Sequence, residues 1–260
     1  MQMRSRRRGP ATGIAMAGEA DPVQRLLLKL RVRDDVSERE EQVLRDAISG
    51  TEEYQGGRTM VRAGAPISQS MLIVEGLVAR FKDLSDGQRQ IQEIHVAGDF
   101  TDLHGFLLKR LEHNVGALTR VRVALAPHDA IRRITEEEPH LTRLLWFSTL
   151  IDSAIQREKI LSVGRRPALS RLAHLLCELR VRLELVGLAE DGHFALPITQ
   201  LDLGDATGLT SVHVNRMLKQ LRDDRLVTFR GGRVTIHDWP RLQKVAEFDT
   251  GFLYLDKRPR

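Results

Sequence analysis

The stretch from Thr199 to Arg233 constrains the fold of this chain more than any other part of it. Thr199 and Asp202 have the spacing of a capping box, which begins a short helix. Gly208 follows that helix, and glycine best tolerates the positive φ of a tight turn. Thr210 is then a typical N-cap for a second helix. Two helices joined by so short a turn must cross steeply, so the stretch predicts a helix-turn-helix unit.

The second of these helices separates an apolar stripe from a polar face. The stripe has the i, i+3, i+4, i+7 spacing of a buried face and consists of Val214, Met217, Leu218 and Leu221. The side chains left pointing outward are Ser211, Val212, Asn215, Arg216 and Lys219. Arg216 can pair with guanine in bidentate fashion, and Asn215 can pair with adenine or contact a phosphate. This face therefore has the chemistry to read bases in a DNA major groove.

A short basic hairpin follows the second helix. Two β-prone runs, 227–229 and 234–236, flank a Gly-Gly turn. Arg230 and Arg233 lie where such a wing would meet the phosphate backbone. From Thr207 to Ile236 there are six basic residues against two acidic ones, and this local clustering favours phosphate contacts. The alternative is an ordinary helical hairpin of an all-α domain with a solvated polar face.

Composition limits the remaining possibilities. The 260 residues suffice for two modest domains, and 42% hydrophobic with 29% charged residues is typical of a globular protein. No apolar run approaches the ~18 residues of a membrane span, and no apolar core follows the first arginines as in a secretory signal. The sequence therefore predicts a cytoplasmic protein without a membrane partner. The single cysteine, Cys177, excludes an internal disulfide and a cysteine-ligated iron–sulfur cluster.

The net charge of +5 comes from the N-terminus. Residues 1–33 hold eight basic residues against two acidic ones, so the rest of the chain is about neutral. Residues 1–22 are expected to form a disordered basic leader. A solvated leader or a misassigned start is favoured over an arm that binds DNA without sequence preference.

Between residues 56 and 126 the apolar period changes to two. Short strands are expected near 59–61, 71–74, 77–81, 90–96 and 115–126, with Gly, Pro and Asp between them. Many short strands at near-regular spacing predict an antiparallel β-roll or jelly roll.

A long helix follows, with Pro139 in its first turn. Its main apolar stripe has coiled-coil spacing and consists of Leu144, Phe147, Ile151, Ala154 and Leu161. These residues are expected to form the seam of a parallel homodimer, because the apolar face is wider than one β-roll can cover. The alternative is a helix packed only on its own domain.

The expected fold class is α+β. The expected divisions are the leader at 1–22, a β-roll domain at 23–136, a dimerisation helix at 137–163, a winged helix-turn-helix domain at 164–238, and a C-terminal helix and tail at 239–260.

The stretch from Thr199 to Arg233 resembles the winged helix-turn-helix of the Crp/Fnr family of bacterial transcription regulators. The resemblance extends over nearly all the chain after about residue 50. It implies a homodimer that binds a roughly palindromic operator, with RNA polymerase as a further partner. Family base-reading positions fall on Ser211, Val212 and Arg216. Family phosphate-contacting positions fall on Thr199, Thr210, His213 and Arg230, and we add Lys219 and Arg233. A charged pair often precedes the arginine in this family, and here that pair is Ser211-Val212.

The resemblance also implies that the β-roll at 23–136 is a sensor domain with an effector site. Family members that bind cyclic AMP use a glutamate for the ribose and an Arg-Ser pair for the phosphate. Counting from Gly98-Asp99-Phe100, the glutamate position is Leu103, and the Arg-Ser region falls near His113 and Asn114. We therefore predict no cyclic-nucleotide binding and no cofactor. Leu103, His104, His113 and Asn114 remain the expected lining of an effector pocket whose ligand the sequence does not identify.

The rival interpretation is a cupin-like metal-dependent enzyme, or a metal or haem sensor, that uses the β-roll histidines. Only Glu93 and His95 have the two-residue spacing of such a metal site, and its third and fourth ligands are missing from the sequence. No Ser-His-Asp arrangement, phosphate-binding glycine loop or paired-carboxylate signature appears elsewhere. The sequence therefore predicts a protein that is not an enzyme and that holds no metal.

Overall fold

The computed structural model describes residues 21–259, so the expected leader lies almost entirely outside the described residues. The helices are α1 (Gln24–Arg31), α2 (Glu38–Asp46), α3 (Gly105–Leu108), α4 (His128–Glu137), α5 (Pro139–Arg165), α6 (Ala168–Glu184), α7 (Gln200–Thr207), α8 (Ser211–Asp223), α9 (Trp239–Ala246) and the 3-10 turn η1 (Gly251–Leu253). Within the described range, none of these helices has both the length and the apolarity that a membrane crossing requires.

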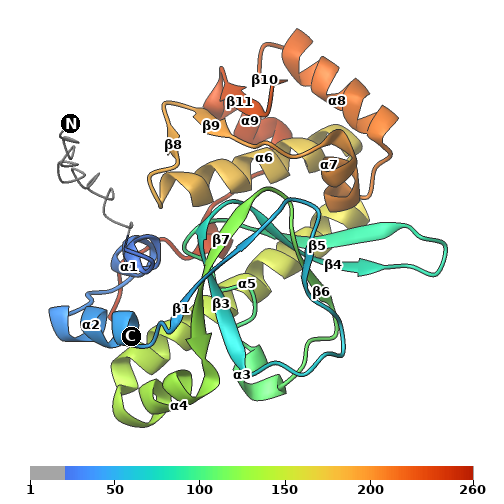
Figure 1. The fold of residues 1–260 in the computed structure, drawn as a ribbon. Coiled ribbons are helices and arrows are strands. Elements are labelled where there is room, and N and C mark those ends of the chain that lie inside the picture. The colour runs from blue at the N-terminus through green and yellow to red at the C-terminus, as the bar shows by residue number, and fades with distance from the viewer. Residues whose placement is uncertain (1–20, 260) are drawn as a thin grey trace, which may run out of the picture.

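The first half of the chain forms a β-roll (Figure 1). One sheet has the strand order β1-β7-β3 and the other has the order β2-β6-β4-β5, with every pairing antiparallel. The strands are β1 (Gly50–Tyr54), β2 (Thr59–Val61), β3 (Gln69–Glu75), β4 (Val78–Asp83), β5 (Arg89–His95), β6 (Asn114–Ala117) and β7 (Val121–Pro127). The two sheets share a buried core that includes Ile73, Val78, Val115 and Val123. The expected antiparallel β-roll is confirmed.

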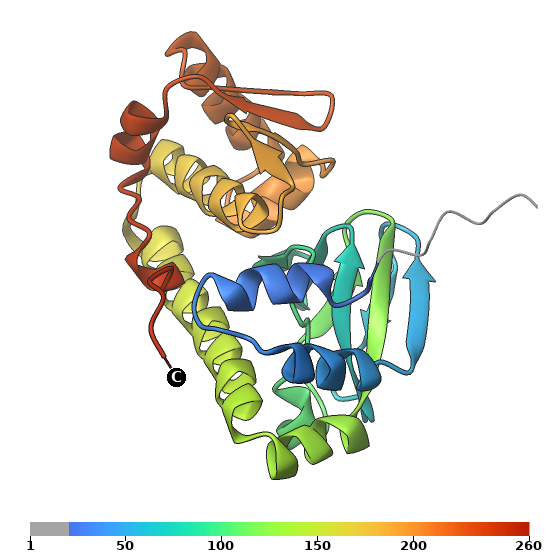
Figure 2. The same ribbon diagram turned by 90° about the vertical axis from the view of Figure 1, so that its left-hand side faces the viewer.

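Helix α5 runs along the β-roll and ends at Arg165, after which Pro167 begins the turn into α6 (Figures 1 and 2). The expected dimer seam on this helix is wrong in most of its members. Leu144, Ile151 and Ala154 are buried inside the protomer, because this face of α5 packs on the β-roll, α4 and the C-terminal segment. Phe147 is half-buried, and its ring contacts that of Tyr254. Of the predicted seam residues, only Leu161 is exposed.

The opposite face of α5 is open and carries several large apolar side chains. Its exposed large apolar residues, which we call the α5 stripe, are Trp146, Leu150, Ile160 and Leu161. Steps of four residues from Trp146 to Leu150 and of ten or eleven from Leu150 to Ile160 and Leu161 keep the stripe on one side of a helix with 3.6 residues per turn. These four residues therefore lie on one side of α5, with Ser153 and Arg157 at the positions between Leu150 and Ile160.

The winged helix-turn-helix forms the other end of the molecule. Both expected caps are confirmed: Thr199 and Asp202 form a capping box, and the Thr210 side chain accepts a hydrogen bond from the His213 amide. Gly208 ends α7 in the left-handed region at φ +67°. A Cβ at Gly204 would lie 2.4 Å from the Leu209 carbonyl oxygen, so only glycine permits this close approach.

A four-stranded sheet completes this domain in the order β10-β11-β9-β8. Its strands are β8 (Ala189–Glu190), β9 (His193–Ala195), β10 (Val227–Arg230) and β11 (Arg233–Ile236). Gly231 and Gly232, both with positive φ, join β10 to β11 as the expected wing.

The C-terminal segment, residues 248–258, returns from the winged domain to the rest of the molecule (Figure 2). Leu253 is buried against α5, and its carbonyl oxygen accepts a hydrogen bond from the Arg33 guanidinium at 3.0 Å. The Arg258 amide donates to the Arg33 carbonyl oxygen at 2.9 Å. The C-terminal tail therefore joins α9 to α5 and to the residues that follow α1.

Candidate DNA-binding surface and sensor interior

Four side chains of α8 form an open edge on the molecular surface, which we call the reading edge: Ser211, Val212, Asn215 and Arg216. All four are exposed, and Val212 reaches 79%. Val214, Met217 and Leu221 on the opposite side of α8 are buried in the domain core, as the apolar stripe predicted. The helix is thus anchored by one face and presents the other. Within residues 21–259, Arg216 has no hydrogen-bond or ion-pair partner.

Two of the polar side chains on α8 already have partners. The Asn215 amide donates to the Gln200 side-chain oxygen at 3.3 Å, so the first residue of α7 orients this amide. Lys219 pairs with Asp223 one turn later at 2.9 Å, with both side chains exposed. An exposed pair of this kind contributes little and exchanges readily with other partners. Lys219 therefore retains the freedom to contact a phosphate.

The six predicted phosphate contacts lie around the reading edge. Thr199 and Thr210 are exposed N-caps of α7 and α8, where backbone N–H groups and the helix dipole favour an anion. His213 is half-buried in the first turn of α8. Arg230 and Arg233 are exposed and directly opposite each other at the tip of the wing. The structure brings all these groups to one end of the molecule.

The expected effector residues gather near α3, but they do not line one closed pocket. His113 is buried, and its ring centroid lies 5.7 Å from that of His104. The Asn114 amide is engaged on both sides, donating to Asp83 at 3.1 Å and accepting from the Ala63 amide at 2.9 Å. Leu103 and His104 instead border an apolar groove between α3, α4 and α5 that also includes Trp146.

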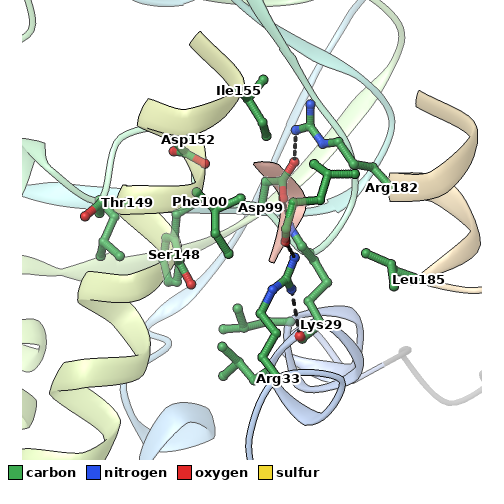
Figure 3. A pocket seen from close by; sticks show the side chains of 16 residues that line it. Lys29, Arg33, Asp99, Phe100, Ser148, Thr149, Asp152, Ile155, Arg182 and Leu185 are labelled. Carbon is green, nitrogen blue, oxygen red and sulfur yellow. Dashed lines mark hydrogen bonds and ion pairs between the residues drawn. The ribbon is translucent and has the colours of Figure 1, made fainter. Parts of the chain in front are cut away.

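The interior between the domains contains a group of buried and half-buried charged side chains that we call the charged cluster: Lys29, Arg80, Glu93, Asp99, Asp152 and Arg182. They come from α1, β4, β5, the loop after β5, α5 and α6 respectively. Several of them surround a cavity between these elements (Figure 3). The cluster therefore joins the sensor domain, the long helix and the DNA-binding domain in one network.

Charge pairing within the cluster is close. Arg80 donates to Glu93 at 3.2 Å and to Asp152 at 2.9 Å, while its Nε donates to the Thr101 carbonyl oxygen at 2.7 Å. Arg182 donates to Asp99 at 2.8 Å. Burial, with the nearby Asp152 carboxylate, raises the pKa of Glu93 to about 7 even though Arg80 acts in the opposite direction.

The same interior contains the histidine of the rival metal interpretation. His95 is fully buried, and its two ring nitrogens lie 3.6 Å from Glu93 and 3.7 Å from Asp99. Burial and the neighbouring guanidinium groups of Arg80 and Arg182 lower the pKa of His95 well below its usual value. The imidazole is therefore neutral at neutral pH.

The tertiary structure supplies the third candidate ligand that the sequence did not reveal. Ligand atoms of Glu93, His95 and Asp152 lie within 4.8 Å of one another. However, Arg80 donates to both carboxylates, so a positive charge already neutralises them. A divalent cation there would be opposed by like charge, and the residues fit a guanidinium-centred ion network better than a metal site.

Sequence reasoning missed most of the charged cluster and the α5 stripe. One signal was available, because Arg80 occurs in the apolar run Leu77–Phe81, where a charged residue requires a buried partner. The partners themselves come from segments far apart in the chain, and no local pattern identifies them.

Comparisons with known proteins agree with this architecture. Residues 51–138 match the model of the cyclic nucleotide-binding domain, and residues 170–245 match that of the Crp-like helix-turn-helix domain. The transcriptional activator protein FnrL of Cereibacter sphaeroides is 27% identical over 201 residues, covering 76% of this chain and 80% of that protein. The nitrogen fixation regulation protein FixK of Bradyrhizobium diazoefficiens is 29% identical, covering 67% of this chain and 72% of that protein.

Solved structures show the same fold. FixK2 from Bradyrhizobium japonicum matches with a TM-score of 0.69 and 27% identity, over 75% of this chain and 96% of that one. A CRP/FNR-family regulator from Thermus thermophilus matches with a TM-score of 0.61 and 20% identity, over 76% and 99% of the two chains. The sequence matches, the β-roll, the long helix and the winged helix-turn-helix together identify this chain as a transcription regulator of the Crp/Fnr family.

Proposed function

We propose that this regulator binds a roughly palindromic DNA operator as a homodimer, with α8 of each protomer in a major groove. The observation that supports this most directly is the reading edge on α8, where Arg216 is exposed and unpaired within the described range. Ser211, Val212, Asn215 and Arg216 are assigned to base contacts. The phosphate contacts are assigned to Thr199, Thr210, His213, Lys219, Arg230 and Arg233. A two-fold dimer would address half-sites one helical turn apart or a multiple of it.

The α5 stripe supports the dimer. Trp146 and Ile160 are 65% and 72% exposed, although side chains of this size are usually buried. A second copy of α5, packed in parallel, would cover the stripe and bring the two DNA-binding domains to the same end of the dimer. The seam proposed here replaces the one expected from Leu144, Ile151 and Ala154.

A contact with RNA polymerase belongs to the same proposal and rests on the family alone. An effector of the β-roll is proposed without an identity, near Leu103 and His104. The cyclic AMP positions carry Leu103, His113 and Asn114, and both sides of the Asn114 amide are already hydrogen-bonded. These features support an effector other than a cyclic nucleotide.

Selection of bound duplexes from a random pool tests the proposal. The purified full-length protein should enrich an inverted repeat whose half-sites are separated by about one helical turn, or a multiple of it, and binding should weaken steeply with added salt. Repeating the selection with a small-molecule extract of cells would reveal an effector as a change in affinity. A protein that enriches no motif at low salt would contradict the proposal.

A further inference from the structure

The hairpin formed by β4 and β5, which we call the sensor hairpin, extends from the β-roll to the helix-turn-helix (Figure 1). Arg89, the first residue of β5, donates from Nη2 to Asp202 at 2.6 Å and from Nε to Asp205 at 2.7 Å. Gln90 donates from its side chain to the Asp205 carbonyl oxygen at 2.7 Å. Both aspartates belong to α7, the helix that precedes the recognition helix α8. The sensor domain thus binds the helix-turn-helix directly.

This contact is built for a guanidinium. Arg89 Nε and Nη2 each bond a different carboxylate, so one edge of the planar guanidinium bridges the two aspartates. The guanidinium also lies 5.6 Å from the centre of the Phe81 ring on β4. The side chains of Asp202 and Asp205 are only 13% and 15% exposed, so solvent screens the pairs less than it would on an open surface.

Holding α7 also holds α8. The Asp202 carboxylate accepts hydrogen bonds from both the amide and the hydroxyl of Thr199, so the residue that contacts Arg89 also caps the start of α7. Gly204 on α7 approaches the Leu209 carbonyl oxygen so closely that a Cβ would lie only 2.4 Å from it. The two helices therefore move as one body, and a contact on α7 fixes the direction in which the reading edge faces.

We propose that Arg89 is a positioning residue for DNA recognition: it fixes the orientation of the helix-turn-helix relative to the sensor domain, and so sets the half-site spacing that the dimer accepts. This inference depends on the proposed function. The reading edge is exposed in this arrangement, so the contact between β5 and α7 does not cover it. A pair of recognition helices that is already oriented loses less conformational freedom on binding DNA. The dimer therefore binds more tightly to operators with one particular half-site spacing.

The test measures binding of the full-length protein to its selected inverted repeat and to repeats with half-sites moved apart or together by one or two base pairs. Arg89→Ala should weaken binding at the preferred spacing by about tenfold and should flatten the preference among spacings. Arg89→Lys keeps the charge but loses the fork, so it should recover only part of the spacing preference. Arg62→Ala, which removes an exposed arginine of the same domain, should change neither.

Asp205→Asn separates positioning from simple electrostatics. Removing a negative charge beside DNA would by itself strengthen binding, whereas loss of the Asp205 half of the Arg89 contact, with the Asp202 half retained, should weaken it by less than Arg89→Ala does. The double variant Arg89→Ala with Asp205→Asn should be about as weak as Arg89→Ala alone, because Arg89→Ala already removes the bond to Asp205. Tighter binding by Asp205→Asn would overturn the proposal.

The two possible failures are distinguishable. If the wild-type protein binds no inverted repeat, the proposed function itself fails. If the wild type binds with a clear spacing preference, and Arg89→Ala retains both that preference and its affinity as Arg62→Ala does, the function stands and the positioning role of Arg89 is wrong.

Discussion

The charged cluster and the reading edge use the same residue types in opposite ways. In the cluster, Arg80 and Arg182 are buried and each donates to at least two acceptors. On the reading edge, Arg216 is exposed and has no partner within the described range. A buried charge must be paired within the protein to be tolerated, whereas an exposed arginine can stay unpaired until a ligand arrives. The comparison separates arginines that hold this structure together from one that is free to bind another molecule.

Removing a buried arginine should have the largest effect. Arg182→Ala removes the positive partner of the buried Glu178 and one of the two positive partners of Asp99, so it should reduce the free energy of unfolding by about 3–5 kcal/mol. Urea denaturation monitored by circular dichroism measures this loss. Arg62→Ala is the control and should change stability by less than about 0.5 kcal/mol. Equal stability of the two variants would mean that the cluster contributes nothing.

A charge introduced into the α5 stripe should weaken dimerisation. Ile160→Lys would place a charge in the proposed seam and should raise the dimer dissociation constant by about 100-fold, or roughly 2.7 kcal/mol, without unfolding the protomer. Ile151→Lys should instead destabilise the protomer, because Ile151 is 9% exposed and packs inside it. Sedimentation velocity and thermal unfolding distinguish the two results. If the Ile160→Lys protein remains a dimer, the α5 stripe is not the dimer interface.

Replacing the exposed Arg216 should alter the sequence specificity of DNA binding. Arg216→Ala should cost on the order of 1–3 kcal/mol on the selected operator and flatten base preference at one position, because a bidentate base contact is lost. Its stability should stay close to that of the wild type. Competition binding against single-base variants of the operator measures the change. Equal losses on cognate and random DNA would contradict a base-reading role.

Burial of a histidine should make the stability of the protein depend on pH. Burial and the adjacent Arg166 lower the pKa of His174 to about 3, against 6.5 for an ordinary histidine. Between these two pKa values His174 is therefore protonated in the unfolded chain and neutral in the folded protein. Stability should fall as the pH drops below about 6.5, by up to about 1.4 kcal/mol per pH unit from this group. His174→Phe should make the stability profile shallower between pH 6.5 and 4. The exposed His193, changed to Gln, is the control and should leave the slope unaltered.

The smallest effect is expected at the wing. Arg230→Ala should weaken binding to every sequence by a similar factor and reduce the slope of log affinity against log salt by about one, because one phosphate contact is lost. Titrations at several salt concentrations measure the slope. A loss confined to the cognate operator would instead assign Arg230 to base contacts.

The helix-turn-helix could be predicted almost completely from the sequence. Its caps, Thr199 and Thr210, its turn at Gly208 and its buried stripe on α8 are signals between residues at most a few turns apart, and each fixes local geometry by itself. The β-roll was predictable for a similar reason, because period-two apolar runs broken by turn residues leave few alternatives. The burial of Val214, Met217 and Leu221 followed directly from their spacing.

Tertiary structure alone decided which face of α5 is buried, where the charged cluster lies, and how Arg89 reaches α7. Helix α5 is apolar on more than one face, so its sequence allowed Ile151 or Ile160 to face a partner, and only packing on the β-roll settled the choice. Arg89 and Asp205 are 116 residues apart, and no period or cap links them. Local pattern determines elements through short-range sterics and hydrogen bonds, whereas contacts between domains depend on how all the elements pack together.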